Sequence, residues 1–334
     1  MTSTAAPVAD RPIDSPGPSI SVGSVVASLG PLFALLLACA YFTVRSDRFL
    51  TGNTLSLIVQ QTAVVGVLAI GQTIVILTGG IDLSCGVIMA FGNIMVTRLA
   101  VVSGVNPYAA VAIMLAFTTL FGLTNGILVT ALRLPPFIVT LGMYSIAFAL
   151  TRIYGHQQSV PNLPSELTWL GGKFKLGGTA VSYGSILMLA LFVLAWYVLR
   201  QTAAGRHVYA LGGNPEGARL SGIRTRRVLL CVYGTAGFLY GIAALLLVAR
   251  TQVGDVNAGL TDNLESITAV VIGGTSLFGG RGTVIGTLIG ALIVSTIRAG
   301  LTLTGVEPTY QVLITGILVI GAVGVDQFAR GKTR

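Results

Sequence analysis

Long apolar stretches separated by short polar connectors run through most of the chain. A transmembrane helix needs about 20 predominantly apolar residues to cross the hydrocarbon core of a bilayer. Ten stretches approach or exceed that length, at residues 24–44, 54–79, 84–103, 108–132, 137–154, 182–199, 228–249, 264–278, 283–303 and 310–328. This pattern predicts an all-α polytopic membrane protein with about ten transmembrane helices.

Little of the chain lies outside these stretches. A head rich in proline and serine, residues 1–23, is predicted to be a disordered tail, and residues 330–334 form a second short tail. Two longer loops, 156–182 and 200–227, and a few short connectors complete the chain. We therefore expect one transmembrane domain over residues 24–329 and no separate soluble domain.

Two of the ten stretches depart from the usual length. The stretch 264–278 is short, whereas 54–79 is long and contains Gly66 and Gly71. Both are predicted to be broken or re-entrant helices, which are tolerated at membrane depth only where they face protein or a water-filled cavity. These stretches are therefore the best sequence indication of a permeation path.

An internal similarity connects the two stretches. Residues 75–86 read VILTGGIDLSCG and residues 270–280 read VVIGGTSLFGG, which indicates a weak internal repeat, either parallel or inverted. Each copy contains a glycine pair where two helix halves could rotate independently. The predicted hinges are Gly79, Gly80, Gly273 and Gly274.

Composition supports the membrane assignment. Only 9% of the 334 residues are charged, against roughly 25% in an ordinary soluble domain, and the mean hydropathy is +0.85. The net charge of +9 comes from basic residues spaced between apolar stretches, which is typical of topology signals and argues against binding of nucleic acid. The three cysteines and two histidines show no metal-ligand spacing, so neither a metal site nor a cofactor is predicted.

The basic residues also predict an orientation. The loop 200–227 contains six arginines and one acid, and the C-terminal tail adds Arg330, Lys332 and Arg334. Cytoplasmic loops carry an excess of basic residues, so both segments are expected in the cytoplasm. An even number of crossings then places the N-terminus in the cytoplasm and the loop 156–182 on the outer face.

Asp82 is the acid placed most clearly in or beside the membrane. A carboxylate at that depth is unfavourable by several kcal/mol unless it is hydrated or paired, which makes function the default hypothesis. In the alternative, Gly79 and Gly80 end one helix, Asp82 caps the next, and Ser84 helps to satisfy its free amides. The two interpretations are compatible.

Uncharged polar residues accompany Asp82 in the apolar stretches. Such side chains often hydrogen-bond across helix interfaces, which is one interpretation. As a set they also offer the donors and acceptors that a neutral polyhydroxy solute requires. The hypothetical substrate path comprises Gln60, Gln72, Asp82, Ser84, Asn93 and Asn125.

The loop segment 212–223 reads GGNPEGARLSGI and predicts one short capped helix on the cytoplasmic face. Asn214 suits the N-cap, Pro215 the first helical position, Glu216 the positive end of the helix dipole and Gly222 the helix stop. The helix is either a membrane-surface helix held by anionic lipids or a rigid docking element for a soluble partner. The residues assigned to docking are Asn214, Pro215, Glu216, Arg219, Leu220, Ser221 and Gly222.

Four blocks resemble a known family. They are AIGQTIVILTGGIDLSCGVIMA at 69–90, GLTNGILVTALRLPPFIVTLGM at 122–143, ALGGNPEGARLSGI at 210–223 and AVVIGGTSLFGGRGTVIGTLIGALI at 269–293. In this order they are similar to the permease subunit of ribose-type sugar ABC importers.

The resemblance implies a multi-pass subunit of the bacterial inner membrane that is not itself an enzyme. Its partners would be a cytoplasmic ATP-binding subunit, a sugar-binding protein outside the membrane, and a second permease in a homodimer or heterodimer. Residues 214–223 would be the coupling helix that enters a groove in the ATP-binding subunit. No nucleotide site is predicted in the chain itself, because its glycine-containing segments lack the complete fingerprints.

Two alternatives stay open. Related permeases carry nucleosides or branched-chain amino acids, so the cargo could be one of these instead of a sugar. A secondary carrier powered by an ion gradient would use Asp82 or Glu265 as its titrating group.

Overall fold

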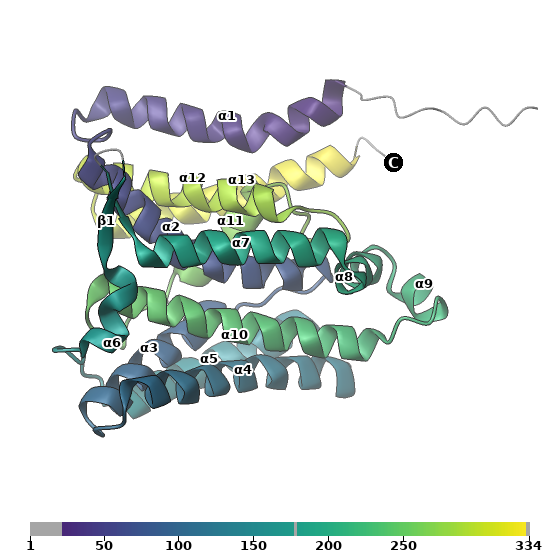
Figure 1. The fold of residues 1–334 in the computed structure, drawn as a ribbon. Coiled ribbons are helices and arrows are strands. Elements are labelled where there is room, and N and C mark those ends of the chain that lie inside the picture. The colour runs from purple at the N-terminus through teal and green to yellow at the C-terminus, as the bar shows by residue number, and fades with distance from the viewer. Residues whose placement is uncertain (1–21, 177–178, 332–334) are drawn as a thin grey trace, which may run out of the picture.

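The protein is a bundle of helices that lie side by side along one direction (Figure 1). The computed structural model describes residues 22–176 and 179–331. Its helices are α1 (Val22–Arg45), α2 (Gly52–Leu77), α3 (Cys85–Val101), α4 (Pro107–Ala131), α5 (Pro136–Gly155), α6 (Ser165–Thr168), η1 (Trp169–Gly171), α7 (Tyr183–Gln201), α8 (Ala203–Gly213), α9 (Pro215–Leu220), α10 (Thr225–Thr251), α11 (Asp262–Ile272), α12 (Val284–Leu303) and α13 (Pro308–Gly331). The two short strands β1 (Lys173–Leu176) and β2 (Thr179–Ser182) pair as an antiparallel hairpin.

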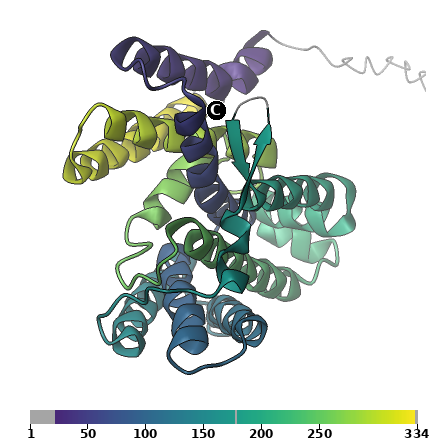
Figure 2. The same ribbon diagram turned by 60° about the vertical axis from the view of Figure 1, so that its left-hand side comes forward.

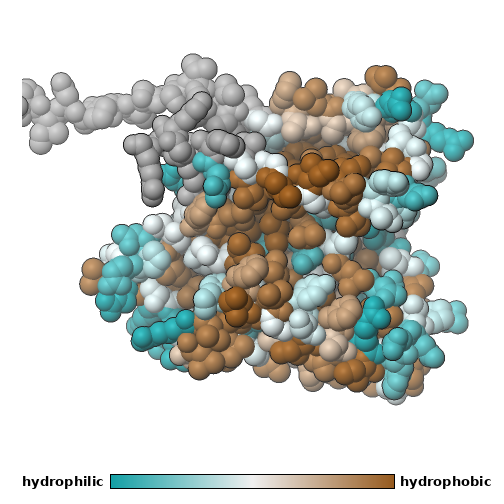
Figure 3. Space-filling model, turned by 180° about the vertical axis from the view of Figure 1, so that it is seen from behind, coloured by the Kyte–Doolittle hydropathy of each residue, from teal (hydrophilic) through white to brown (hydrophobic). Residues whose placement is uncertain are grey.

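The predicted polytopic all-α fold is confirmed. In the described part of the chain, α2, α4, α5, α7, α10 and α12 are each long and apolar enough to cross a membrane, and shorter apolar helices occupy Gly30–Arg45, Cys85–Val101 and Pro308–Gly321. Figure 3 shows the matching surface, with a hydrophobic band between two hydrophilic ends. The chain is therefore a multi-pass membrane protein.

The two ends of the bundle carry different structures (Figure 1). Helices α8 and α9 lie at one end, together with the start of α1 and the end of α13, and we call this the α9 end. Helix α6 and the β1–β2 hairpin lie at the other, which we call the hairpin end. The two longer loops thus lie at opposite ends. Of the predicted tails 1–23 and 330–334, residues 1–21 and 332–334 lie outside the described residues, whereas 22–23 belong to α1 and 330–331 to α13.

Of the two stretches of unusual length, only the short one forms a broken helix. Helix α2 is continuous through Gly66 and Gly71, and these glycines instead allow close packing against Phe192 and Tyr240. Helix α11 has only 11 residues, or about 16.5 Å at 1.5 Å per residue, so it crosses roughly half of a bilayer core, as expected for a broken helix. The loop 200–227 contains helix α8 as well as α9, although only one short helix was predicted.

The core is centred on α2, α3 and α10, whose buried side chains form the largest hydrophobic cluster. Figure 2 shows α2 near the centre, with α12 and α13 on one side, α7 on the other and the blue helices α4 and α5 below. Small residues permit the closest helix contact, between α4 and α10. A Cβ atom added at Gly122 would collide with the Tyr233 carbonyl oxygen, and one added at Gly237 would collide with the Thr118 carbonyl oxygen. Close backbone approach of this kind is how helices associate in membranes.

This crossing generates a stability prediction. Gly122→Ala should lower the free energy of unfolding by about 1–3 kcal/mol, because the added methyl group meets backbone that cannot move aside cheaply. The measurement is unfolding of the purified chain in mixed micelles. Gly142→Ala on α5 is the matched control, because a Cβ atom there meets nothing within 4 Å. Equal destabilisation by both substitutions would contradict the packing argument.

Candidate functional site

A first stretch of non-helical backbone enters the membrane-spanning region after α2. The chain turns at Gly79, which has a φ of +82°, and passes Gly80 beside the Tyr233 hydroxyl. It then runs to Asp82, which meets Tyr240. Tyr240 lies near the middle of α10, about 22 Å from the start of that helix by the helical rise. Helix α3 therefore begins at mid-depth, at the end of a re-entrant segment 78–84.

Asp82 is fully buried and holds this segment in place. One carboxylate oxygen accepts hydrogen bonds from the Ser84 amide at 2.8 Å and the Ser84 hydroxyl at 2.5 Å, while the other accepts the Tyr240 hydroxyl at 3.1 Å. The Asn125 amide donates to Ser84 Oγ at 3.0 Å. Helices α3, α4 and α10 thus meet in one polar network. The predicted capping is not found, because Ser84 is the N-cap of α3 and no side chain there bonds the free amides of the helix, while Asp82 accepts from the Ser84 amide instead.

A second non-helical segment, 252–261, approaches from the hairpin end along α3. The Asp255 amide donates to Asn93 Oδ1 at 2.8 Å. Further along, Gly259 lies against Gly86, and a Cβ atom on either residue would collide with the carbonyl oxygen of the other. Helix α11 begins where this segment ends. Each segment is partly buried, with Asp82 covered in the first and Gly259 in the second, and buried backbone at this depth needs protein partners.

The two segments meet at the first turns of α3 and α11. Asn263 Nδ2 donates to the Leu83 carbonyl oxygen at 3.3 Å, and Cys85 Sγ lies 3.5 Å from Ser266 Oγ. The positive ends of two helix dipoles therefore lie together inside the membrane. Acidic groups compensate them, namely Asp82 before α3 and Asp262 and Glu265 in the first turn of α11.

The acids of α11 are paired with a basic residue on α12. Arg298 Nη1 lies 2.8 Å from Glu265 Oε1 and 3.7 Å from Asp262 Oδ1. The side chain of Glu265 is 7% exposed and that of Arg298 is 39% exposed. Pairing of this kind is what permits charged groups at membrane depth.

The predicted path residues separate into two groups. Asp82, Ser84 and Asn125 share one network, and Gln72 is buried with no hydrogen-bond partner among the described residues. Gln60 and Asn93 lie elsewhere. Gln60 donates to the Ser56 carbonyl oxygen of its own helix, and Asn93 Oδ1 accepts from the Asp255 amide of the second segment.

Sequence reasoning missed two members of the network. Tyr240 and Asn263 lie 158 and 180 residues from their partners Asp82 and Leu83, and no local spacing connects them. Asn263 lies between Asp262 and Leu264 at the start of α11 and could have been noticed as a polar residue at a helix start. Tyr240 lies inside a long apolar run and carries no such signal.

At the α9 end, the last turn of helix α8 packs backbone against backbone with the turns that follow α2 and α11. The Gly280 amide donates to the Leu77 carbonyl oxygen at 3.0 Å, and a Cβ atom at Gly212 would collide with that same oxygen. The Tyr209 hydroxyl of α8 donates to the Gly282 carbonyl oxygen at 2.9 Å. We call this contact of 77–80, 209–213 and 279–282 the glycine junction. It connects the helix before α9 to both copies of the internal repeat.

The polarity of the repeat follows from contacts with α12. Thr73 hydrogen-bonds Thr287 near the start of α12, whereas Ile58 packs with Ala299 near its end, so α2 and α12 are antiparallel. Gly286 packs against Gly273, and Glu265 pairs with Arg298, so α11 and α12 are antiparallel as well. Helices α2 and α11 therefore run in the same direction, and the two copies are parallel.

The four predicted hinge glycines differ in their surroundings. Gly79 and Gly274 have positive φ values of +82° and +84°. A Cβ atom at Gly80 would crowd the Tyr233 hydroxyl, and one at Gly273 would collide with the Gly286 carbonyl oxygen. Their hinge role stays a prediction.

Helix α9 has the bounds and caps that were predicted. Asn214 Oδ1 accepts the Gly217 amide at 2.9 Å, Pro215 is the first helical residue, and Gly222 has a φ of +83°. On its surface Arg219 Nη2 lies 2.6 Å from Glu216 Oε1, and the hydrogen bond from Arg219 lowers the pKa of Glu216. The Leu220 side chain is 75% exposed. A rigid, charged helix with an uncovered leucine thus projects from the α9 end (Figure 1).

Metal binding has no support in the part of the chain that the structure describes. Within residues 22–176 and 179–331, no three His, Cys, Asp or Glu side chains gather closely enough to hold an ion. The features that bear on function are the buried break between α2 and α3, the charged cluster around Arg298 and the projecting helix α9.

Comparison with known proteins identifies the family of this chain. The sequence model of the family described as "Branched-chain amino acid transport system / permease component" matches residues 53–323. The chain is 42% identical over 306 residues to the fructose import permease protein FrcC of Rhizobium meliloti, covering 90% of this chain and 85% of the relative. It is 37% identical over 310 residues to the ribose import permease protein RbsC of Bacillus subtilis, covering 92% and 95%.

A third relative gives the same result. The ribose import permease protein RbsC of Escherichia coli K12 is 39% identical over 296 residues, which cover 88% of this chain and 92% of the relative. The chain is thus a membrane permease component. It belongs to the family whose model it matches, and the resemblance to ribose-type import permeases is confirmed.

The network around Asp82 generates a second stability prediction. Tyr240→Phe should lower the free energy of unfolding by about 1.5–3 kcal/mol, the contribution typical of a hydrogen bond to a charged group. Unfolding in mixed micelles measures the loss. Tyr197→Phe on α7 is the control, since that side chain is 54% exposed and its loss of a hydroxyl should change stability by less than about 0.5 kcal/mol. A Tyr240 variant as stable as the control would show that the hydrogen bond to Asp82 does not stabilise the fold.

Proposed function

We propose that this chain is the membrane-spanning subunit of an ATP-driven importer that carries a neutral monosaccharide inward. The relatives named as fructose and ribose import permeases supply the cargo class. The observation that carries the proposal is the projecting helix α9, which is capped at both ends and connected through α8 to the glycine junction. A carrier driven by an ion gradient has no use for such an element.

Energy would come from a separate ATP-binding subunit that docks on α9. That subunit would lie in the cytoplasm, and the α9 end would face it, in agreement with the arginine-rich loop 200–227. A binding protein outside the membrane would deliver sugar at the hairpin end. A second permease, identical or homologous, would complete the channel.

The glycine junction supplies a route for motion. A displacement of α9 moves α8, and α8 is joined to the Gly282 carbonyl by Tyr209 and to the Leu77 carbonyl by close backbone contact at Gly212. Leu77 and Gly282 border the segments that contain the four predicted hinge glycines. The two repeats would therefore move together and open the bundle on one side at a time.

The docking role of α9 is tested by reversing its charges. Glu216→Lys and Arg219→Glu should each leave membrane insertion intact and abolish ATPase activity that is stimulated by the binding protein. The double variant Glu216→Lys, Arg219→Glu restores the ion pair within α9 but presents the opposite charge pattern to a partner. ATPase assays on the reconstituted complex should find the double variant as inactive as the single variants. Recovery of activity in the double variant would show that the pair only stabilises α9.

The junction is tested by a milder change. Tyr209→Phe removes the hydrogen bond to Gly282 and should lower sugar uptake per ATP hydrolysed by roughly two- to tenfold, the range one lost hydrogen bond supports, while the ATP-binding subunit still docks. Uptake and hydrolysis are measured together in proteoliposomes, with Tyr197→Phe as control. An unchanged ratio of sugar uptake to ATP hydrolysis would show that the Tyr209 hydrogen bond does not couple the two.

A further inference from the structure

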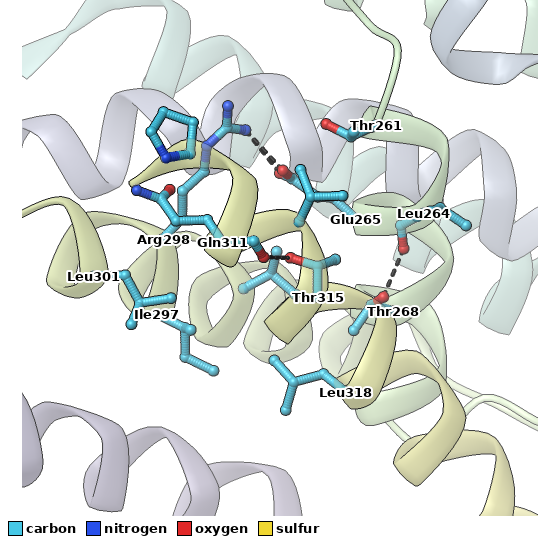
Figure 4. A pocket seen from close by; sticks show the side chains of 13 residues that line it. Thr261, Leu264, Glu265, Thr268, Ile297, Arg298, Leu301, Gln311, Thr315 and Leu318 are labelled. Atoms are coloured by element: carbon cyan, nitrogen blue, oxygen red, sulfur yellow. Dashed lines mark hydrogen bonds and ion pairs between the residues drawn. The ribbon is translucent and has the colours of Figure 1, made fainter. Parts of the chain in front are cut away.

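We propose that the cavity between α11, α12 and α13 is a binding subsite for a neutral monosaccharide inside the permease itself. This inference rests on the proposed function and assigns residues to its substrate. The cavity measures about 200 Å³, which suits a single sugar ring. Its wall consists of Thr261, Leu264, Glu265, Thr268, Val294, Ile297, Arg298, Leu301, Pro308, Gln311, Val312, Thr315 and Leu318 (Figure 4).

The position of the cavity suits a substrate on its way through. It adjoins the first turns of α11, beside the meeting point of the two re-entrant segments, and reaches Pro308 at the start of α13. It therefore extends from about mid-depth toward the hairpin end. Half-helix starts near the middle of the membrane are where transporters commonly bind their cargo.

The lining is divided into a polar and an apolar side. In Figure 4, Arg298, Glu265 and Thr261 lie along one side of the view, and Ile297, Leu301 and Leu318 gather along the other. A sugar ring has the same division, with hydroxyl groups at its rim and C–H groups on its faces. Pockets for small molecules typically combine an apolar wall with a few placed polar groups.

The polar groups of the cavity wall can both donate hydrogen bonds to sugar hydroxyls and accept hydrogen bonds from them. The Thr268 hydroxyl donates to the Leu264 carbonyl oxygen at 2.6 Å and the Thr315 hydroxyl donates to the Gln311 carbonyl oxygen at 2.9 Å, so each oxygen keeps its lone pairs for a ligand. Arg298 engages Glu265 through Nη1, which leaves the other guanidinium N–H groups to donate. A sugar hydroxyl both donates and accepts, and so it fits this mixture.

Charge balance favours an uncharged ligand. On the cavity wall one acid, Glu265, is paired with one base, Arg298, at 2.8 Å. The wall therefore offers no net charge to attract an anion or a cation. An ionic solute would have to break this pair, which is strongly unfavourable for buried groups.

The test measures binding of D-ribose and D-fructose to the purified full-length chain in nanodiscs by ligand-observed NMR. The wild-type chain should bind at least one of these sugars, and the double variant Thr268→Val, Thr315→Val should bind it at least fivefold more weakly. The matched control is Thr124→Val, Thr130→Val on α4, where both hydroxyls make the same bond to their own helix, at 2.8 and 2.7 Å, away from the cavity. The control should bind like the wild type.

Three results would overturn the subsite. One is equal affinity of the cavity variant and the control. Another is tighter binding of D-ribose 5-phosphate than of D-ribose, which would indicate an anion site. The third is absence of sugar binding by the wild-type chain together with a loss of dimers in the cavity variant, which would assign the cavity to a second copy of the chain.

An uptake assay distinguishes failure of the subsite proposal from failure of the proposed function. A strain lacking the chromosomal gene is complemented with the wild-type or variant chain and assayed for uptake of labelled sugar. Uptake restored equally by the wild type and the cavity variant would refute the subsite and keep the importer. Absence of restored monosaccharide uptake by the wild-type chain would refute the importer itself.

Discussion

Backbone amides and carbonyls cannot be left unpaired in the hydrocarbon core of a membrane, and the structure of this protein is organised around two places where the helical pattern stops at that depth. The segments 78–84 and 252–261 enter from opposite ends and meet where α3 and α11 begin. Asp82 satisfies the Ser84 amide, Asn93 satisfies the Asp255 amide, and Asn263 reaches the Leu83 carbonyl. Each irregular segment thus depends on side chains from the other half of the chain.

The same contacts connect the segment 78–84 to the helices that would move it. Asp82 is held by Tyr240 of α10, and α10 packs against α4 through glycines that leave no room for a methyl group. The glycine junction contains residues of both parallel repeat copies, 75–86 and 270–280, and α8 contacts both copies there. Displacement of α9 would therefore reach the centre of the membrane through the close backbone contacts of the glycine junction and the hydrogen bonds of Tyr209 and Tyr240.

Much of this architecture is readable from the sequence, because apolar length and glycine pairs are local signals. The stretch 212–223 predicted α9 with its N-cap Asn214 and its stop at Gly222, since caps act within a few residues. Asp82 and Ser84 were found together for the same reason. Helix α8 was missed because its apolar residues are few and lie in a basic loop, and Gly66 and Gly71 were misinterpreted because the packing against Phe192 and Tyr240 is invisible to a local pattern. The pairing of Glu265 with Arg298 spans 33 residues and needed the fold.

We propose that the chain is a gate whose energy comes from a separate ATP-binding subunit docked on α9. The most direct measurement is sugar accumulation in proteoliposomes that contain the chain alone, or the chain with its ATP-binding subunit, binding protein and ATP. We expect accumulation against a gradient only in the complete system. Accumulation by the chain alone, with or without an imposed ion gradient, would contradict it.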